Sequence, residues 1–115
     1  LSPAKALEEM LDILINGDYA KAYKGIAKDS DADNKTPGSD ELVALVGGRT
    51  SLSTYEIMNQ TISSDGKTAV VTINVSVKYE SDEEIDLKRT LMPMKMVKEN
   101  EVWKVAYASL ENIYK

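Results

Sequence analysis

The acidic residues between positions 29 and 40 have the most specific spacing in this chain. Asp29, Asp31, Asp33 and Asp40 stand at positions 1, 3, 5 and 12 of that stretch, and carboxylates at this spacing can wrap a calcium ion in an EF-hand-like loop. Asn34 replaces the glycine of such loops, and Asp40 is shorter than the usual glutamate. A solvated acidic loop fits the same residues. We favour that loop and expect no stabilisation by calcium.

Three methionines alternate along a segment with strand periodicity. Met92, Met94 and Met96 would therefore lie on one side of a strand. Their flexible, polarizable side chains fill irregular gaps in cores, and they also line adaptable binding surfaces. Both interpretations stay open, and the methionines are kept as candidate ligand-binding residues.

Aromatic residues supply the remaining candidates for ligand binding. Tyr19 and Tyr23 are one helical turn apart and could present two hydroxyls to a pocket. Trp103, Val105 and Tyr107 alternate in a segment that we predict to be the final strand. Packing in the core, with the tyrosine hydroxyls in contact with water, explains all of them equally well. The candidate set is thus Tyr19, Tyr23, Met92, Met94, Met96, Trp103 and Tyr107.

The composition excludes several kinds of chemistry. The chain contains no cysteine and no histidine, so thiolate nucleophiles, disulfides and histidine general bases are absent. Its 14 basic and 19 acidic residues give a net charge of −5, which disfavours binding to nucleic acid. No apolar run approaches the length of a membrane span. We predict no catalytic residues and no cofactor.

Helix signals dominate the first part of the sequence. Ser2 and Pro3 are a typical N-cap and first-turn proline, and the leucine spacing predicts a helix from about Pro3 to Ile15. Asn16-Gly17 ends that helix, and Asp18 caps a second, shorter one that extends to Ile26. A third helix is predicted from Asp40 to Val46, ending at Gly47-Gly48.

From Leu52 onward the hydrophobic period changes to two, which is typical of strands. Two strands, 55–62 and 68–79, are joined by an Asp65-Gly66 hairpin turn. A third strand contains Pro93, which argues for a bulge or an edge. A turn at Asn100-Glu101 leads into a fourth strand. The expected fold is a single α+β domain, residues 1–115, with two or three N-terminal helices packed on a curved antiparallel sheet of about four strands.

Three segments in this order resemble a known family. They are the segment 16–23 (NGDYAKAY), the hairpin 64–71 (SDGKTAVV) and the closing segment 97–105 (VKENEVWKV). They resemble the nuclear transport factor 2-like superfamily, in which a cystatin-like sheet wraps a long N-terminal helix into a cone. The likeness is greatest to its branch of uncharacterised bacterial envelope lipoproteins. It implies an extracytoplasmic domain, anchored by a lipid, whose targeting segment has been removed.

The same resemblance raises an enzymatic alternative. Ketosteroid isomerases and small dehydratases of this superfamily hold acid and base groups inside the cone, whereas the inward face of strand 68–79 carries no acid here. We therefore predict a noncatalytic binding or interaction module for an unknown small apolar molecule or protein partner, with a homodimer through the sheet as a further expectation. The alternative is an isomerase or dehydratase acting on an apolar carbonyl compound. A buried carboxylate beside a tyrosine would favour the enzyme.

Overall fold

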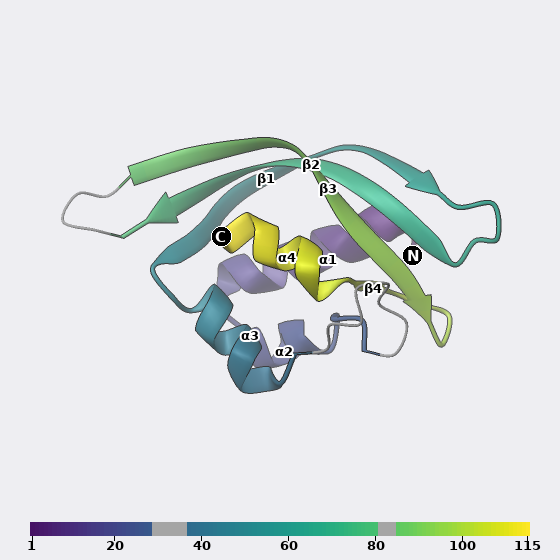
Figure 1. Cartoon of the computed structure of the whole chain (residues 1–115), viewed down its shortest axis with the longest axis horizontal. Helices are drawn as coiled ribbons and strands as arrows, with labels where there is room; N and C mark the ends of the chain where they lie inside the picture. Colours follow the sequence, from purple (N-terminus) through teal and green to yellow (C-terminus); the bar gives the residue numbers. More distant parts are fainter. Residues whose placement is uncertain (29–36, 81–84) are drawn as a thin grey trace.

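A computed structural model describes residues 1–28, 37–80 and 85–115 of the chain. The fold is α+β, as predicted: the four strands form one antiparallel sheet in the order β1-β2-β3-β4, and the helices lie beneath it (Figure 1). No helix within the described residues is long and apolar enough to cross a membrane. The elements are α1 (Pro3–Asn16), α2 (Tyr19–Tyr23), α3 (Ser39–Val46), β1 (Thr50–Ile62), β2 (Thr68–Tyr79), β3 (Ile85–Glu99), β4 (Val102–Val105) and α4 (Tyr107–Tyr114).

Local capping defines helix α1. The hydroxyl of Ser2 accepts a hydrogen bond from the amide of Lys5 (3.1 Å), and Pro3 starts the first turn. The amide of Ala4 is also free of an intrahelical partner, and it donates to Oε1 of Gln60 on β1 (3.0 Å). Gly17 ends the helix with φ +83°, a left-handed conformation that favours glycine. The predicted helix is confirmed and is one residue longer than expected.

Helix α2 is shorter than predicted. Asp18 caps it by accepting from the amide of Lys21 (3.2 Å), but the helix ends at Tyr23. Ile26, predicted to be helical, instead forms a parallel bridge with Val105 of β4. The chain leaves the helix early because an extended backbone at this point can pair with the edge of the sheet.

The sheet bends sharply because its ladders contain β-bulges. Strand β1 carries an extra residue at Ser53 and at Met58, and β3 carries one where Thr90 and Leu91 lie opposite Asn74. Leu91 has a φ of +51°, and its amide donates to Oδ1 of Asn74 (2.8 Å). Bulges increase local twist and bend the bulged strand. These irregularities give the sheet the concave face seen in Figure 1.

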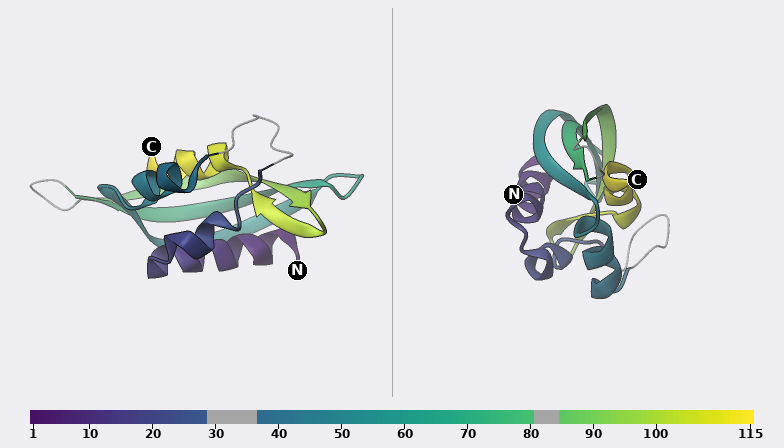
Figure 2. Two further views of the ribbon diagram at one scale, coloured as in Figure 1. Left: turned by 90° about the horizontal axis from the view of Figure 1, so that it is seen from below. Right: turned by 90° about the vertical axis from the view of Figure 1, so that its left-hand side faces the viewer.

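The concave face holds the core. Figure 2 shows α1 and α4 beneath opposite sides of the arched sheet, with α1 mainly against β1 and α4 against β3. Leu7, Leu11 and Leu14 of α1 are buried in one cluster with Val71, Ile73 and Trp103. Every buried residue of β1, β2 and β3 is apolar, so hydrophobic burial holds the helices to the sheet.

The C-terminal helix α4 corrects the sequence prediction. We placed Tyr107 on the final strand with Trp103 and Val105, but β4 ends at Val105 and Tyr107 begins α4. Tyr107, Leu110, Ile113 and Tyr114 recur at helical spacing, and all four are buried. The hydroxyl of Ser109 accepts from the amide of Lys95 (2.9 Å) and fixes α4 to β3. Tertiary packing thus selects a helix where short-range alternation suggested a strand.

Replacing Leu11 by alanine tests the seating of α1. Leu11 is fully buried, so the substitution removes buried methylene groups and leaves a cavity, and we expect it to lower the free energy of unfolding by about 2–5 kcal/mol. Urea denaturation measures this. Ile15→Ala on the same helix is the control, because Ile15 is 40% exposed. A loss at Leu11 below about 0.5 kcal/mol would contradict the arrangement.

Candidate ligand-binding site

An apolar groove lies between α1, α2 and β4, the last strand of the sheet, and Figure 2 shows these elements from below. It consists of two adjoining hollows of about 260 and 130 Å³ that share Leu1, Ala6, Val102 and Trp103. Most of the lining surface is apolar. The further apolar side chains that line it are Met10, Ile13 and Ala22. We call this the α1–β4 groove.

Backbone pairing between residues 25–27 and β4 builds the wall of the groove. The amide of Val105 donates to the carbonyl of Gly25, and the amide of Ala27 donates to the carbonyl of Val105, both at 2.8 Å. A Cβ at Gly25 would lie 2.6 Å from the Cε of Met10. Only glycine therefore lets this segment approach α1 without displacing the methionine that lines the groove.

Trp103 lines both hollows of the α1–β4 groove. It is 8% exposed and belongs to the core cluster, and the Nζ of Lys98 lies 5.4 Å from its ring centroid. The turn that precedes it contains Asn100 and Glu101, both with positive φ. This turn confirms the predicted hairpin. It positions a partly accessible aromatic surface where an apolar ligand would contact it.

The charges around the groove differ in sign from those of the whole chain. Lys21, Lys24 and Lys104 line it together with one acidic side chain, Glu9, in the larger hollow. The net charge there is 3 − 1 = +2, against −5 for the chain. Nζ of Lys104 donates to the carbonyl of Lys24 and so closes the gap between β4 and the end of α2. Glu101 lines the smaller hollow.

The methionine stripe lies in and beside the core. Met94 and Met96 are fully buried, and Met92 is half-buried against the same cluster. None of the three lines either hollow of the α1–β4 groove. Pro93 occupies an edge position as expected, since β4 pairs with β3 only from Met96 onward. Met94 and Met96 therefore fill the core. Ligand binding by the three methionines stays a prediction without geometric support.

The candidate tyrosines do not line the groove together with Trp103. The hydroxyl of Tyr23 donates to the carbonyl of Pro37 (2.9 Å), and Nζ of Lys28 lies 4.4 Å from its ring centroid. Tyr19 is partly buried against α3, near Gly47. Tyr107 lies on α4. Of the seven predicted ligand-binding residues, only Trp103 lines the groove.

A second hollow, about 570 Å³, lies between α3, α4 and the start of β1. It contains a buried carboxylate, Glu111, near Tyr107 and Tyr114. Oε2 of Glu111 accepts from Nζ of Lys115 at 2.6 Å. Burial, with smaller effects from Glu41 and Glu111, raises the pKa of Tyr107. We call this the α3–α4 hollow; a buried carboxylate, Glu111, and two tyrosines, Tyr107 and Tyr114, line it.

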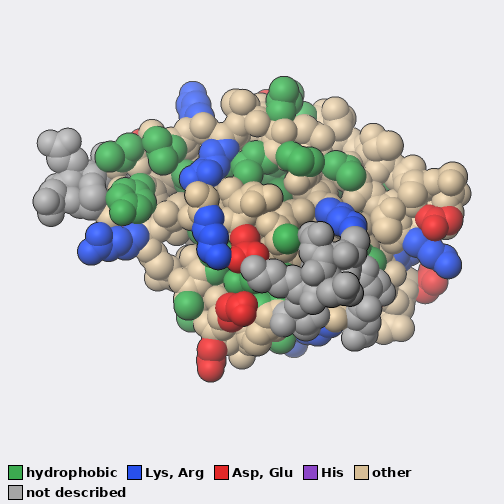
Figure 3. All heavy atoms as spheres, viewed as in Figure 1, with side chains coloured by type: hydrophobic (Ala, Val, Ile, Leu, Met, Phe, Trp, Pro, Cys, Tyr) green, Lys and Arg blue, Asp and Glu red, His purple; other side chains and the backbone are tan. Residues whose placement is uncertain are grey.

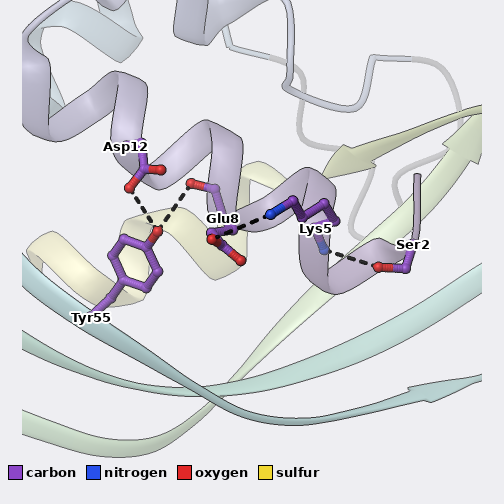
Figure 4. Close-up of polar contacts among 5 residues, drawn as sticks. All are labelled: Ser2, Lys5, Glu8, Asp12 and Tyr55. Atoms are coloured by element: carbon purple, nitrogen blue, oxygen red, sulfur yellow. Dashed lines mark hydrogen bonds and ion pairs between the residues drawn. The ribbon is translucent and has the colours of Figure 1, made fainter.

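Hydrogen bonds of Tyr55 connect β1 to α1 (Figure 4). The hydroxyl of Tyr55 donates to Oδ1 of Asp12 at 2.6 Å and lies 3.4 Å from the carbonyl oxygen of Glu8. Burial and the hydrogen bond to Asp12 raise the pKa of Tyr55. Asp12 is exposed. This pair therefore acts as a tether on the surface of the domain.

The calcium candidates fall mostly outside the described residues. Asp29, Asp31 and Asp33 are not described, and Asp40 is exposed in the first turn of α3. Within the described ranges, no group of three or more acidic side chains is placed to hold a metal ion.

Exposed apolar residues on the sheet bear on the predicted homodimer. Met58, Val70 and Leu91 are exposed on β1, β2 and β3, with Leu91 at 64%, and Figure 3 shows hydrophobic side chains gathered along the upper side of the molecule. Among the described residues, no element buries these three side chains. The homodimer through the sheet stays a prediction.

Sequence reasoning missed the residues that line the groove. Met10 and Ile13 are ordinary positions of an amphipathic helix, and Val102 is one residue of a strand. These residues come together only because the β3–β4 hairpin folds back against α1. No local sequence pattern predicts that packing. The one local signal is Gly25, a glycine inside the helix that we predicted to extend to Ile26, where it allows a close approach to α1.

Comparison with known proteins adds no family assignment. No protein-family model matches the chain, and no curated protein matches it either.

Replacing Tyr55 by phenylalanine should change how stability depends on pH. The pKa of Tyr55 is raised from its ordinary value of 10.0 in the folded chain, so the folded state keeps its proton where the unfolded state releases it. This contribution is complete below pH of about 10 and is lost as the pH rises above it. Urea denaturation from about pH 8 to about pH 11 should show a shallower fall for Tyr55→Phe than for the unsubstituted chain. Equal slopes would contradict the raised pKa.

Proposed function

We propose that this chain is a noncatalytic binding module that takes a small apolar molecule in the α1–β4 groove. The observation that carries the proposal is the groove itself: a mostly apolar recess that is open to solvent and has a tryptophan lining both of its hollows. Ligand sites are typically concave and apolar with few polar groups. The combined volume is small, which favours a short apolar chain over a sterol-sized molecule.

The family and the location belong to the same proposal. A bent four-stranded sheet around a long N-terminal helix supports a domain of the nuclear transport factor 2-like superfamily. The three segments quoted above resemble its envelope lipoprotein branch. An extracytoplasmic, lipid-anchored binding domain is the function that this resemblance favours.

The absence of evident catalytic machinery in the groove supports binding without turnover. Its titratable side chains are lysines and glutamates at the margin, and Glu9, Lys21 and Lys24 are exposed. Catalytic acids and bases usually have pKa values shifted by burial or by a close partner. A groove with exposed charges at the margin and an apolar floor is suited to holding a ligand.

Filling the groove should abolish binding. Ala6 lines both hollows, so Ala6→Leu places a larger side chain where the ligand would lie. Trp103 is the only tryptophan, and its fluorescence reports on the groove directly. We expect 1-decanol to change this fluorescence saturably, and Ala6→Leu to weaken the affinity at least ~10-fold.

Ala20→Leu is the matched control, because Ala20 is exposed on α2 and does not line the groove. Its affinity should equal that of the unsubstituted chain. Saturable binding of equal strength in Ala6→Leu would place the ligand elsewhere. No saturable fluorescence change in any variant would end the proposal.

The α3–α4 hollow favours a second candidate function, an isomerase or dehydratase of apolar carbonyl compounds. Glu111 is a buried carboxylate that lines the same hollow as Tyr107, and isomerases of this kind use a carboxylate base near a tyrosine. The ion pair with Lys115 opposes it, because a paired carboxylate is held in its charged form and is a weaker base. We rank this function second.

Turnover of a model ketosteroid decides the enzymatic alternative. We expect no reaction above the buffer rate. If turnover occurs, Glu111→Gln should reduce it about 10²-fold or more, because general base catalysis contributes at least that factor. The exposed Glu9→Gln is the control. A rate that depends on Glu111 and not on Glu9 would replace binding with catalysis as the function of this chain.

A further inference from the structure

We infer that the ligand of the α1–β4 groove is an anionic amphiphile, a molecule with a short apolar chain and a negatively charged head such as a carboxylate. The inference rests on the proposed function, since it names the ligand class of the same groove. The apolar chain lies between Met10, Ile13 and Trp103, and the head group lies near Lys21, Lys24 and Lys104. Each of these six side chains lines the larger hollow.

The distribution of charge identifies the head group. Three lysines line the larger hollow of a chain whose net charge is −5, against one acidic side chain, Glu9, in that hollow and a second, Glu101, in the adjoining one. Lysine ammonium groups are compact, flexible charges that attract anions without demanding a fixed geometry. They come from two elements, α2 and its C-cap on one side and β4 on the other. An anion at this margin thus meets positive charge from both sides of the groove.

The position of the lysines identifies the class of ligand as amphiphilic. A lysine side chain can lay its methylene stem along an apolar surface and keep its ammonium group in water. The groove therefore offers an apolar floor and a positively charged, solvated margin at the same place. A purely polar anion would leave the apolar surface unused, and a neutral apolar molecule would gain nothing from the positive charge of the lysines.

The same observations favour a free molecule over a membrane surface. The groove is a recess between α1, α2 and β4, so a flat bilayer surface would not reach its floor. The chain as a whole is acidic and is repelled by anionic lipid surfaces. A single short amphiphile can enter the recess and bring only its head group to the lysines.

Three probes with the same ten-carbon chain test the head group. Decanoate is anionic, 1-decanol is neutral and decyltrimethylammonium is cationic, and each is titrated below its micelle-forming concentration while Trp103 fluorescence is recorded. We expect decanoate to bind at least ~5-fold more tightly than decanol at low salt, with decyltrimethylammonium weakest. Added salt should reduce the difference between decanoate and decanol, because ions screen exposed charges.

Substituting the lysines locates the effect. The triple variant Lys21→Gln, Lys24→Gln, Lys104→Gln should lose the preference for decanoate over decanol. The matched control is Lys5→Gln, Lys67→Gln, Lys88→Gln, which removes three exposed lysines outside the groove and gives the same net charge, 11 − 19 = −8. The double variant Lys21→Gln, Lys24→Gln keeps the bond between Lys104 and the carbonyl of Lys24. It should lose most of the preference while folding normally.

The outcomes separate this inference from the proposed function. Equal affinity for decanoate and decanol, or an equal loss in the control triple variant, overturns the anionic head group while the apolar groove stands. Failure of both probes to bind overturns the groove itself. Sedimentation with vesicles that contain anionic lipid should leave the chain in solution, and co-sedimentation that the Lys21→Gln, Lys24→Gln variant abolishes would assign the lysines to a membrane surface instead.

Discussion

The bend of the sheet is the constraint on which the other features of this domain depend. A flat sheet of four strands would have left the apolar faces of α1 and α4 partly in water, because two adjacent helices need a concave surface to be covered. Extra residues in β1 and β3 create that surface, and the Asn74 side chain satisfies the amide of Leu91 at the sharpest point. Leu91 adopts a left-handed backbone there. This conformation is costly for leucine, so the burial of the core must offset it.

The groove follows from the same bend. Because β3 curves over the core, its hairpin with β4 returns toward α1, and the edge of β4 pairs with residues 25–27. That pairing satisfies backbone groups that would otherwise face solvent at a strand edge. It also leaves a recess next to α1, where Gly25 gives Met10 its space. The recess is therefore a consequence of closing a short edge strand against a helix.

Much of the fold could be predicted from local signals, and most of the site could not. Ser2, Asp18 and Gly17 mark helix ends through their own side chains or backbone freedom, and strand 68–79 is recorded in its alternation. Helix α4 was missed because Trp103, Val105 and Tyr107 alternate like a strand, while the helical spacing from Tyr107 to Tyr114 is only two turns long. The β-bulges could not be predicted, because no residue pattern in the sequence marks their positions. Trp103 was found because tryptophan is rare and large, whereas Ala6 and Ile13 acquire a role only through tertiary packing.

The two hollows differ in a way that separates binding from catalysis. In the α3–α4 hollow the carboxylate of Glu111 is buried but already neutralised by Lys115, so the energy of desolvation that could raise its basicity is offset by an ion pair. In the α1–β4 groove Lys21 and Lys24 are exposed and Lys104 is half-buried, and lysines outnumber the two glutamates, Glu9 and Glu101. An excess of positive charge beside an apolar lining attracts an anionic amphiphile without altering its chemistry. The physical arrangement of this chain is therefore better suited to holding a ligand than to transforming one.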